Sequence, residues 1–508
     1  MGTPEAGDTS GEDFVAQIFT VAGTGTPGRE GDGGPAVSAK LDRPLGVVVD
    51  AFGTVYFSDF GNHQIRKITT DGKIGTVAGD GKGTYRGDNG PAASAQLYHP
   101  RELTLDSAGN LYVADGHNHR IRKITPDGTI TTVAGTNGNG FTGDGGPATS
   151  ARLDLPCGVA VDSAGDLYIA DHRNHRIRRV AADGKISTIA GHRGAGFTGD
   201  GGPAASAQLN GPQGVTVDSA DNLYVVDTGN HRIRKITPDG KITTVAGMNG
   251  YGVKGDGGPA TSAQLYYPIR VVLDSTGALY IADSSNHRIR KVAPDGTIST
   301  VVGAAGKGFS GDGGPAASAQ LQNPYGLAVD CVDTLYISDH ANHRIRKITS
   351  EKMAGLPDSG AVVSWVNTRS KLRMGVYRES LKDGAAAHQS LASLRAHQKW
   401  RLIATGQADG EILYRIENVR SGKALEVTDA HETPGAPVAQ RAYLGGDASH
   451  QQWRLITMSA ETDTSRIYEI ANHHSGLLLH AGTNAPTALT QQGTDGDHRN
   501  RQWQLLPA

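Results

Sequence analysis

Glu102 and Arg270 are the residues of this sequence whose types and positions most strongly suggest chemistry. Both occupy the last position of a recurring Pro-x-Gly step. The other four copies of that step keep glycine, at Gly46, Gly158, Gly214 and Gly326. A carboxylate can act as a general base, and a carboxylate with a guanidinium can clamp a polar ligand. The two charges can also simply neutralise each other, so both alternatives stay open.

Histidines and other polar residues recur at a second repeated position. His172 and His340 directly follow an aspartate, and His117 and Arg173 stand one position later in their own copies. Imidazole titrates near neutral pH and serves as a general acid or base. The candidate catalytic residues are therefore Glu102, Arg270, His172 and His340. The residues expected to bind a ligand are Arg101, Glu102, His117, His172, Arg173, Tyr267, Arg270, Tyr325 and His340.

A repeat of 56 residues positions these side chains. The tetrad Asn-His-Arg/Gln-Ile starts at Asn62, Asn118, Asn174, Asn230, Asn286 and Asn342. The loop Gly-Asp-Gly/Asn-Gly-Pro-Ala keeps the same spacing, from Gly31 to Gly311. Each unit contains four short apolar stretches separated by glycine-containing turns, which predicts four antiparallel strands. Such a unit repeated radially is typical of a β-propeller blade, so the sequence predicts an all-β, six-bladed propeller.

The two ends of the repeat region predict how the ring closes. The motif of the fourth strand occurs once before the first blade, at Ile18–Gly23, whereas the last blade stops after Ile348 without supplying its own. The N-terminal strand is therefore expected to complete the last blade, which removes an open sheet edge.

A six-fold ring places blades 2 and 5 opposite each other, and likewise blades 3 and 6. Glu102 then faces Arg270 across the channel, and His172 faces His340. Opposed blades are too far apart to give a metal three ligands at about 2–2.2 Å unless the channel narrows. No metal and no cofactor is predicted.

Three segments of the third repeat resemble a known family. Gly158–Asp162, Leu167–Asp171 and Asn174–Arg178 are similar to NHL repeats, and the resemblance extends from about residue 14 to 350. It implies a six-bladed propeller. Most such propellers act as binding platforms, and some relatives carry lyase or hydrolase chemistry with a metal in the channel.

Other repeated residues are interpreted as structural. The histidine of each Asn-His pair is expected to make a hydrogen bond within its own blade. The Asp-Gly-Gly-Pro loops are interpreted as turns, because one carboxylate per loop is too few for calcium. The Arg-Ile-Arg-Lys runs are expected to form a solvated face. Cys157 and Cys331 fall at opposite ends and sides of the ring, so they are not expected to pair.

A second module follows the propeller. Trp400, Trp453 and Trp503 stand in matching Gln/Arg-x-Trp contexts, with spacings of 53 and 50 residues. Three such repeats resemble the ricin B-type β-trefoil, in which the tryptophans pack in the core. The resemblance implies that an acid and an aromatic residue of one repeat bind sugar. The middle repeat matches best, which gives the candidate carbohydrate-binding residues Glu426, Tyr443, His450 and Gln451.

Composition limits the partners. The net charge is −2, which favours no nucleic acid partner, and the apolar runs are too short to cross a membrane. The N-terminal residues lack a basic stretch followed by an apolar one, so no signal peptide is expected in them; the compartment stays open between the cytoplasm and secretion after signal removal. The expected organisation is a flexible segment 1–13, a propeller 14–350, a linker 351–360 and a trefoil 361–508.

These features favour a ligand-binding protein. The propeller would recognise a small polar molecule or peptide at its channel mouth, and the trefoil would dock a carbohydrate or another partner. The alternative is a lyase, hydrolase or cyclase with its active site at the same mouth. A scaffold for protein assembly is the third interpretation.

Overall fold

The structure is a computed structural model that describes residues 16–349 and shorter segments between 362 and 507. Within the first range it leaves out residues 51–52, 193, 275, 304–306 and 331–332. Several predictions lie outside the described residues: the segment 1–13, the linker 351–360, Cys331, Tyr443 and His450. The predicted domain boundaries therefore stay predictions.

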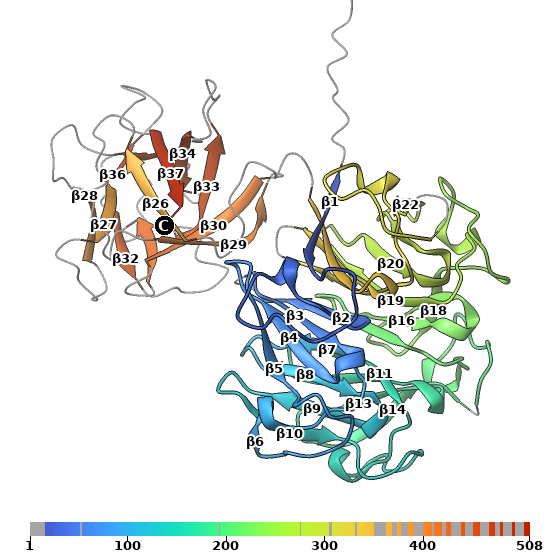
Figure 1. Ribbon diagram of the computed structural model, residues 1–508. Helices are drawn as coiled ribbons and strands as arrows, with labels where there is room; N and C mark the ends of the chain where they lie inside the picture. The colour runs from blue at the N-terminus through green and yellow to red at the C-terminus, as the bar shows by residue number, and fades with distance from the viewer. Residues whose placement is uncertain are drawn as a thin grey trace, which may run out of the picture.

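Six antiparallel sheets follow one another along the chain and form the six predicted blades (Figure 1). Blade 1 consists of β2 (Pro44–Val49), β3 (Val55–Asp59), β4 (Gln64–Ile68) and β5 (Ile74–Ala78). Blade 2 consists of β7 (Pro100–Leu105), β8 (Leu111–Asp115), β9 (Arg120–Ile124) and β10 (Thr129–Ala134), with the short β6 (Gly90–Pro91) at its edge. Blade 3 consists of β11 (Pro156–Val161), β12 (Leu167–Asp171), β13 (Arg176–Val180) and β14 (Ile186–Ala190).

The second half of the ring repeats this plan. Blade 4 consists of β15 (Gly214–Val217), β16 (Leu223–Asp227), β17 (Arg232–Ile236) and β18 (Ile242–Ala246). Blade 5 consists of β19 (Pro268–Leu273), β20 (Leu279–Asp283), β21 (Arg288–Val292) and β22 (Ile298–Val302). Blade 6 contains β23 (Pro324–Val329), β24 (Leu335–Asp339) and β25 (Arg344–Thr349). A 3-10 turn follows the second strand of each blade: Phe60–Asn62, Gly116–Asn118, His172–Asn174, Thr228–Asn230, Ser284–Asn286 and His340–Asn342. A second set of 3-10 turns is Ala36–Ser38, Ala92–Ser94, Ala148–Ser150, Ala204–Ser206, Ala260–Ser262 and Ala316–Ser318.

The N-terminal strand closes the ring as predicted. Strand β1 (Gln17–Ala22) is the fourth strand of blade 6, in the order β1-β25-β24-β23. Its register places Ile18 opposite Ile348, and Ile18 is fully buried. In Figure 1 the blue strand β1 lies beside the yellow strands from the other end of the propeller. Because the first and last segments share one sheet, blade 6 has no exposed pairing edge at β25.

The hydrophobic core lies between neighbouring blades. Each of six buried clusters combines residues of two adjacent blades. One cluster packs Ala170 and Ile177 of blade 3 against Val215, Leu223 and Ile236 of blade 4. Apolar contacts therefore hold neighbouring blades side by side.

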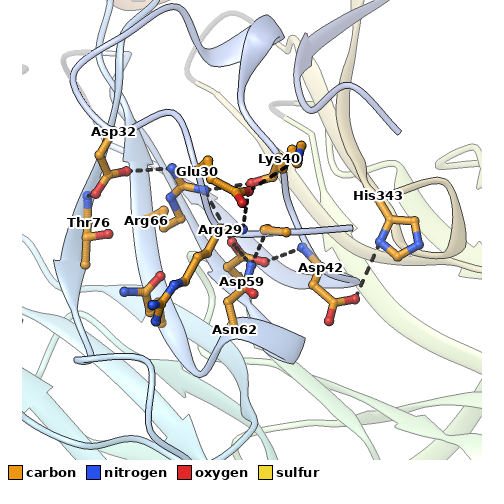
Figure 2. A network of polar contacts seen from close by, with 12 residues as sticks. Arg29, Glu30, Asp32, Lys40, Asp42, Asp59, Asn62, Arg66, Thr76 and His343 are labelled. Atoms are coloured by element: carbon orange, nitrogen blue, oxygen red, sulfur yellow. Dashed lines mark hydrogen bonds and ion pairs between the residues drawn. The ribbon is translucent and has the colours of Figure 1, made fainter. Parts of the chain in front are cut away.

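The Arg-Ile-Arg-Lys runs do not form a solvated face, and this prediction was wrong. The arginine at the third position of each run is fully buried, at Arg66, Arg122, Arg178, Arg234, Arg290 and Arg346. In blade 4 the Arg234 guanidinium contacts Asp227 at 3.3 Å and Asp200 at 2.8 Å. Figure 2 shows the equivalent network in blade 1, where Arg66 lies between Asp32 and Asp59. The Asp-Gly-Gly-Pro loop thus supplies a carboxylate to a buried arginine.

The buried carboxylate of this network is itself well bonded. In blade 4 Asp227 accepts hydrogen bonds from the Asn210 backbone N–H, from Asn230 Nδ2 and from Arg234 Nη1. Burial raises the pKa of Asp227 to about 6, and these donors oppose the rise. The carboxylate is therefore ionised at neutral pH and balances the arginine inside the blade.

The histidine of each Asn-His pair bonds to the next blade, not within its own blade as predicted. His175 Nδ1 accepts the backbone N–H of Gly211 at 3.0 Å, and His231 Nδ1 accepts that of Tyr267 at 3.2 Å. The last contact of the series joins His343 of blade 6 to Arg43 of blade 1. These six bonds connect the blades around the complete ring.

The C-terminal strands form a separate sheet of twelve strands that contains no propeller strand. Six of them pair in a closed cycle: β26 (Val362–Asn367), β29 (Trp400–Ala408), β30 (Glu411–Asn418), β33 (Trp453–Thr457), β34 (Ile467–Asn472) and β37 (Gln502–Pro507). The other six form three hairpins: β27 (Arg373–Val376) with β28 (Ala385–Ser390), β31 (Ala424–Val427) with β32 (Val438–Arg441), and β35 (Leu478–His480) with β36 (Thr490–Gln492). A six-stranded barrel with three hairpins is a β-trefoil, as predicted. Trp365, Trp400 and Trp453 are fully buried in it.

Candidate ligand-binding site

Two sets of loops meet at one end of the propeller channel, and this end is called the mouth here. One set leads into the inner strands, and the other consists of the 3-10 turns after the second strands. The two sets are hydrogen-bonded in every blade, for example by His117 N–H to the Tyr98 carbonyl and by Gly229 N–H to the Asn210 carbonyl. Side chains that differ between blades are therefore presented on a constant backbone frame.

Glu102 and Arg270 meet across the channel and pair with each other. Arg270 Nε lies 3.5 Å from Glu102 Oε2, and each residue is only 7% exposed. Arg270 Nη1 also donates a hydrogen bond of 2.8 Å to the Val215 carbonyl. Burial raises the pKa of Glu102, and the neighbouring Arg270 opposes that rise. The two charges neutralise one another, which is the second of the two alternatives that the sequence left open.

A cavity of about 20 Å³ lies beside this ion pair. Its lining includes Arg101, Cys157, Gln213 and Tyr325, which lead into different inner strands. This volume accommodates about one water molecule. The structure thus brings together Arg101, Glu102 and Tyr325 from the predicted set, but leaves almost no space for a ligand between them.

Aromatic and imidazole rings cover the mouth above blades 6, 1 and 2. Phe60 stacks on His99 with ring centroids 4.3 Å apart, and His99 lies 4.6 Å from His117. His340 lies 4.8 Å from Tyr325, and its Nδ1 is 3.2 Å from the Pro44 carbonyl. Burial lowers the pKa of His99, His117 and His340 to about 4. These three imidazoles are therefore neutral at pH 7.

A groove opens on the opposite side of the mouth, above blades 3 to 5. Its volume is about 330 Å³. Three of the predicted residues line it: His172, Arg173 and Tyr267. The Arg173 side chain is 58% exposed, and Tyr267 is 47% exposed. The groove thus combines free space with accessible polar and aromatic groups.

Sequence reasoning did not select the other residues that line this groove. These are His175, Asn210, Gly211, Gln213, Thr228 and Gly229. Gly211 belongs to a set of equivalent positions that all adopt a positive φ between 49° and 57°. The set is Arg43, His99, Leu155, Gly211, Tyr267 and Asn323. Blade 4 alone has no side chain at this position. The lone glycine is visible when the six repeats of the sequence are aligned.

His340 gives a test of the buried imidazoles. Since the pKa of His340 is about 4 in the folded state and near 6.5 when unfolded, the folded protein binds fewer protons between these values. Stability linked to His340 is therefore lost as the pH falls from about 6.5 to 4. We expect His340→Gln to reduce the loss between pH 7.5 and 4.5 by about 2 kcal/mol, measured by denaturant unfolding. Equal losses in both proteins contradict this assignment.

The candidate sugar residues of the trefoil are only partly described. Glu426 is 1% exposed, and Glu426 Oε2 accepts a hydrogen bond of 3.0 Å from Gln451 Nε2. Trp453 Nε1 donates to the neighbouring Leu425 carbonyl. The structure thus brings Glu426 and Gln451 together, but inside the domain. For the Glu426 carboxylate to bind a sugar, its hydrogen bond with Gln451 would have to rearrange.

The described residues contain no group of three or more histidine, cysteine, aspartate or glutamate side chains placed to hold a metal ion. In the same part of the chain, no helix combines the length and apolar character that crossing a bilayer requires.

The geometry defines a closed six-bladed β-propeller followed by a β-trefoil. Sequence models of three families match: the NHL repeat over residues 209–236, the teneurin NHL domain over 80–142, 138–198 and 252–308, and the ricin-type β-trefoil lectin domain-like family over 354–441 and 449–508. The chain is therefore an NHL-repeat propeller joined to a ricin B lectin-like domain.

Individual relatives agree with this assignment. The chain is 28% identical to Teneurin-m of Drosophila melanogaster over 435 residues, which are 78% of this chain and 15% of that protein. It is 30% identical to Teneurin-1 of Gallus gallus over 359 residues, which are 63% of this chain and 13% of that protein. The chain thus spans only a small part of these relatives. The chain also resembles a solved protein of unknown function from Bacteroides thetaiotaomicron, with 19% identity and a TM-score of 0.51. The match covers 67% of this chain and 77% of that protein, and it shows the fold alone.

Proposed function

We propose that this chain is a binding protein whose propeller recognises a small polar molecule or peptide in the groove above blades 3 to 5. The observation that carries the proposal is the loss of six-fold symmetry at Gly211, where a groove of about 330 Å³ replaces a side chain. Pockets with a few accessible polar and aromatic groups are the usual places for small ligands. Arg173 offers a cation and Tyr267 an aromatic face there.

The enzymatic alternative has weaker support. A lyase, hydrolase or cyclase needs an acid or base that can exchange a proton with its substrate. Glu102 is buried against Arg270, and His340 Nδ1 lies 3.2 Å from the Pro44 carbonyl. Of the four candidate catalytic residues, His172 alone lines the groove. Binding needs none of these proton transfers.

The trefoil would then dock the propeller to a carbohydrate or protein partner. The Glu426 carboxylate of the trefoil accepts a hydrogen bond from Gln451 inside the domain. This contact favours docking through other surface groups over direct sugar recognition by that carboxylate.

Gly211→Tyr tests the groove directly. The equivalent position of blade 5 is Tyr267 at φ 49°, so the backbone at Gly211, with φ 57°, tolerates a side chain. A Cβ at Gly211 would meet the tip of the His172 ring at 2.9 Å, and the new phenol would fill the groove. We expect at least about a hundredfold loss of affinity for ligands identified in peptide and small-molecule panels by isothermal titration.

The matched control is Asn323→Tyr at the same position of blade 6. It introduces the same side chain on the same backbone, with φ 51°, away from the groove. Unchanged affinity in Asn323→Tyr with a loss in Gly211→Tyr supports the proposal. Equal affinity in both variants, or panels without any binder, would overturn it.

A further inference from the structure

Arg101 is the cation of the mouth that lacks an acidic partner. It holds the middle position of the Pro-x-Gly step in blade 2, where the other blades have Leu45, Cys157, Gln213, Ile269 and Tyr325. The carboxylate nearest in sequence, Glu102, is paired with Arg270. Within the part of the chain that the structure describes, Arg101 takes part in no ion pair, and its buried Nε has no hydrogen-bond partner.

The groups around Arg101 do not compensate its charge. Its guanidinium carbon lies 5.6 Å from the centroid of the Phe60 ring. Its positive charge contributes to the lowered pKa of His99, His117 and His172, although burial is the largest cause for each. Burial raises the pKa of the Cys157 thiol, so that neighbour is also neutral. The surroundings are thus neutral rings and a thiol.

The charge count at the channel end is therefore +1. Glu102 and Arg270 cancel, and Arg101 remains. The remaining acids of the mouth are engaged elsewhere: Asp154 lies 3.6 Å from His119 and 3.9 Å from Arg173. A partly buried cation without a counter-ion creates a positive potential in its cleft, which attracts an anion.

Arg101 lies close to the groove. It lines the cavity of about 20 Å³, and Gln213 lines both that cavity and the groove of about 330 Å³. A ligand in the groove that extends one end past Gln213 would therefore approach Arg101. Only a small terminal group fits at that end.

We propose that this terminal group is a carboxylate, so that the mouth selects small monoanionic carboxylic acids by binding them to the Arg101 guanidinium. The inference rests on the proposed function and names the ligand class of the same site. Guanidinium and carboxylate match in geometry, through paired N–H donors and oxygen acceptors. One uncompensated charge suits a monoanion better than a phosphate dianion, and the aromatic ring of Tyr267 in the groove suits a ligand with an apolar body.

The test uses phenylacetate and its neutral analogue phenylacetamide as probes, with isothermal titration on the full chain. We expect phenylacetate to bind wild type at least about tenfold more tightly than phenylacetamide. Arg101→Gln should remove that preference by weakening phenylacetate alone. The matched control is Arg86→Gln, which removes an exposed arginine of a loop outside the mouth and should leave both affinities unchanged.

The outcomes separate this inference from the proposed function. Phenylacetate binding that survives Arg101→Gln, or inorganic phosphate displacing phenylacetate more effectively than acetate does, overturns the carboxylate assignment. Absence of binding by either probe, while panel ligands still lose affinity in Gly211→Tyr, also overturns the inference and leaves the groove intact. Panels without any binder that depends on Gly211 instead overturn the proposed function.

Discussion

Arg234→Met is expected to lower the free energy of unfolding of the propeller by about 3–5 kcal/mol. The substitution keeps an unbranched apolar stem but removes the guanidinium between Asp227 and Asp200. Asp227 is fully buried, and without the balancing cation its carboxylate must either stay charged in the interior or take up a proton. The large effect follows from leaving one charge of a buried pair alone, which costs more than the pair itself contributes. Denaturant unfolding followed by circular dichroism measures it.

Lys235→Met on the same strand is the control for this substitution. Lys235 is partly exposed, and its Nζ lies 5.4 Å from the Tyr224 ring centroid. Its replacement should change stability by less than about 1 kcal/mol. Similar losses of unfolding free energy in both variants would show that the ion pairs of Arg234 do not account for the loss in Arg234→Met.

Ile18→Asn is expected to destabilise the propeller by about 4 kcal/mol or more. Ile18 is fully buried in the cluster between blades 5 and 6, so the change removes apolar contacts and buries an amide among Val272, Leu327 and Ile337. Because Ile18 lies on β1, the loss falls on the strand that closes the ring. We expect the propeller transition in calorimetry to shift down and the protein to associate through the freed edge of β25.

Phe19→Asn is the control that distinguishes loss of ring closure from a general effect of an asparagine in β1. Phe19 is the next residue of the strand, pairs with Lys347 and is only partly buried. It should destabilise far less and leave the protein monomeric by size-exclusion chromatography. An Ile18→Asn protein that melts like wild type would contradict closure by β1.

The architecture of the propeller could be predicted because every blade repeats it. The constant 56-residue spacing fixed the number of blades, and the displaced strand at Ile18 indicated the closure. The same arithmetic placed Glu102 opposite Arg270, which the ion pair of 3.5 Å confirms. Whether opposed charges reach each other depends on channel width, and that width is set by packing between blades rather than by any local pattern.

The buried arginines show where a local pattern misled. An Arg-Ile-Arg run alternates charge with an apolar residue, as a half-exposed strand does. The partner Asp200 lies 34 residues before Arg234 and reaches it only through the fold. Six-fold recurrence of both Asp and Arg was the available signal, since pairs that recur together in every repeat are candidates for contact.

The groove was missed for a related reason. Reactive side-chain types pointed to Glu102, Arg270 and the histidines. The groove instead lies where blade 4 lacks a side chain, at Gly211, a position that carries a side chain in every other blade. A comparison of side-chain size at each repeat position would have shown that blade 4 is hollowed at the mouth.

The central claim is that ligands bind at the propeller mouth and not through the trefoil. Hydrogen–deuterium exchange of the full chain, with and without the tightest panel ligand, tests it most directly. Ligand should slow amide exchange in the segments that line the groove, around residues 172–175, 210–213 and 228–229. Protection confined to residues 361–508, with these segments unchanged, would contradict the claim.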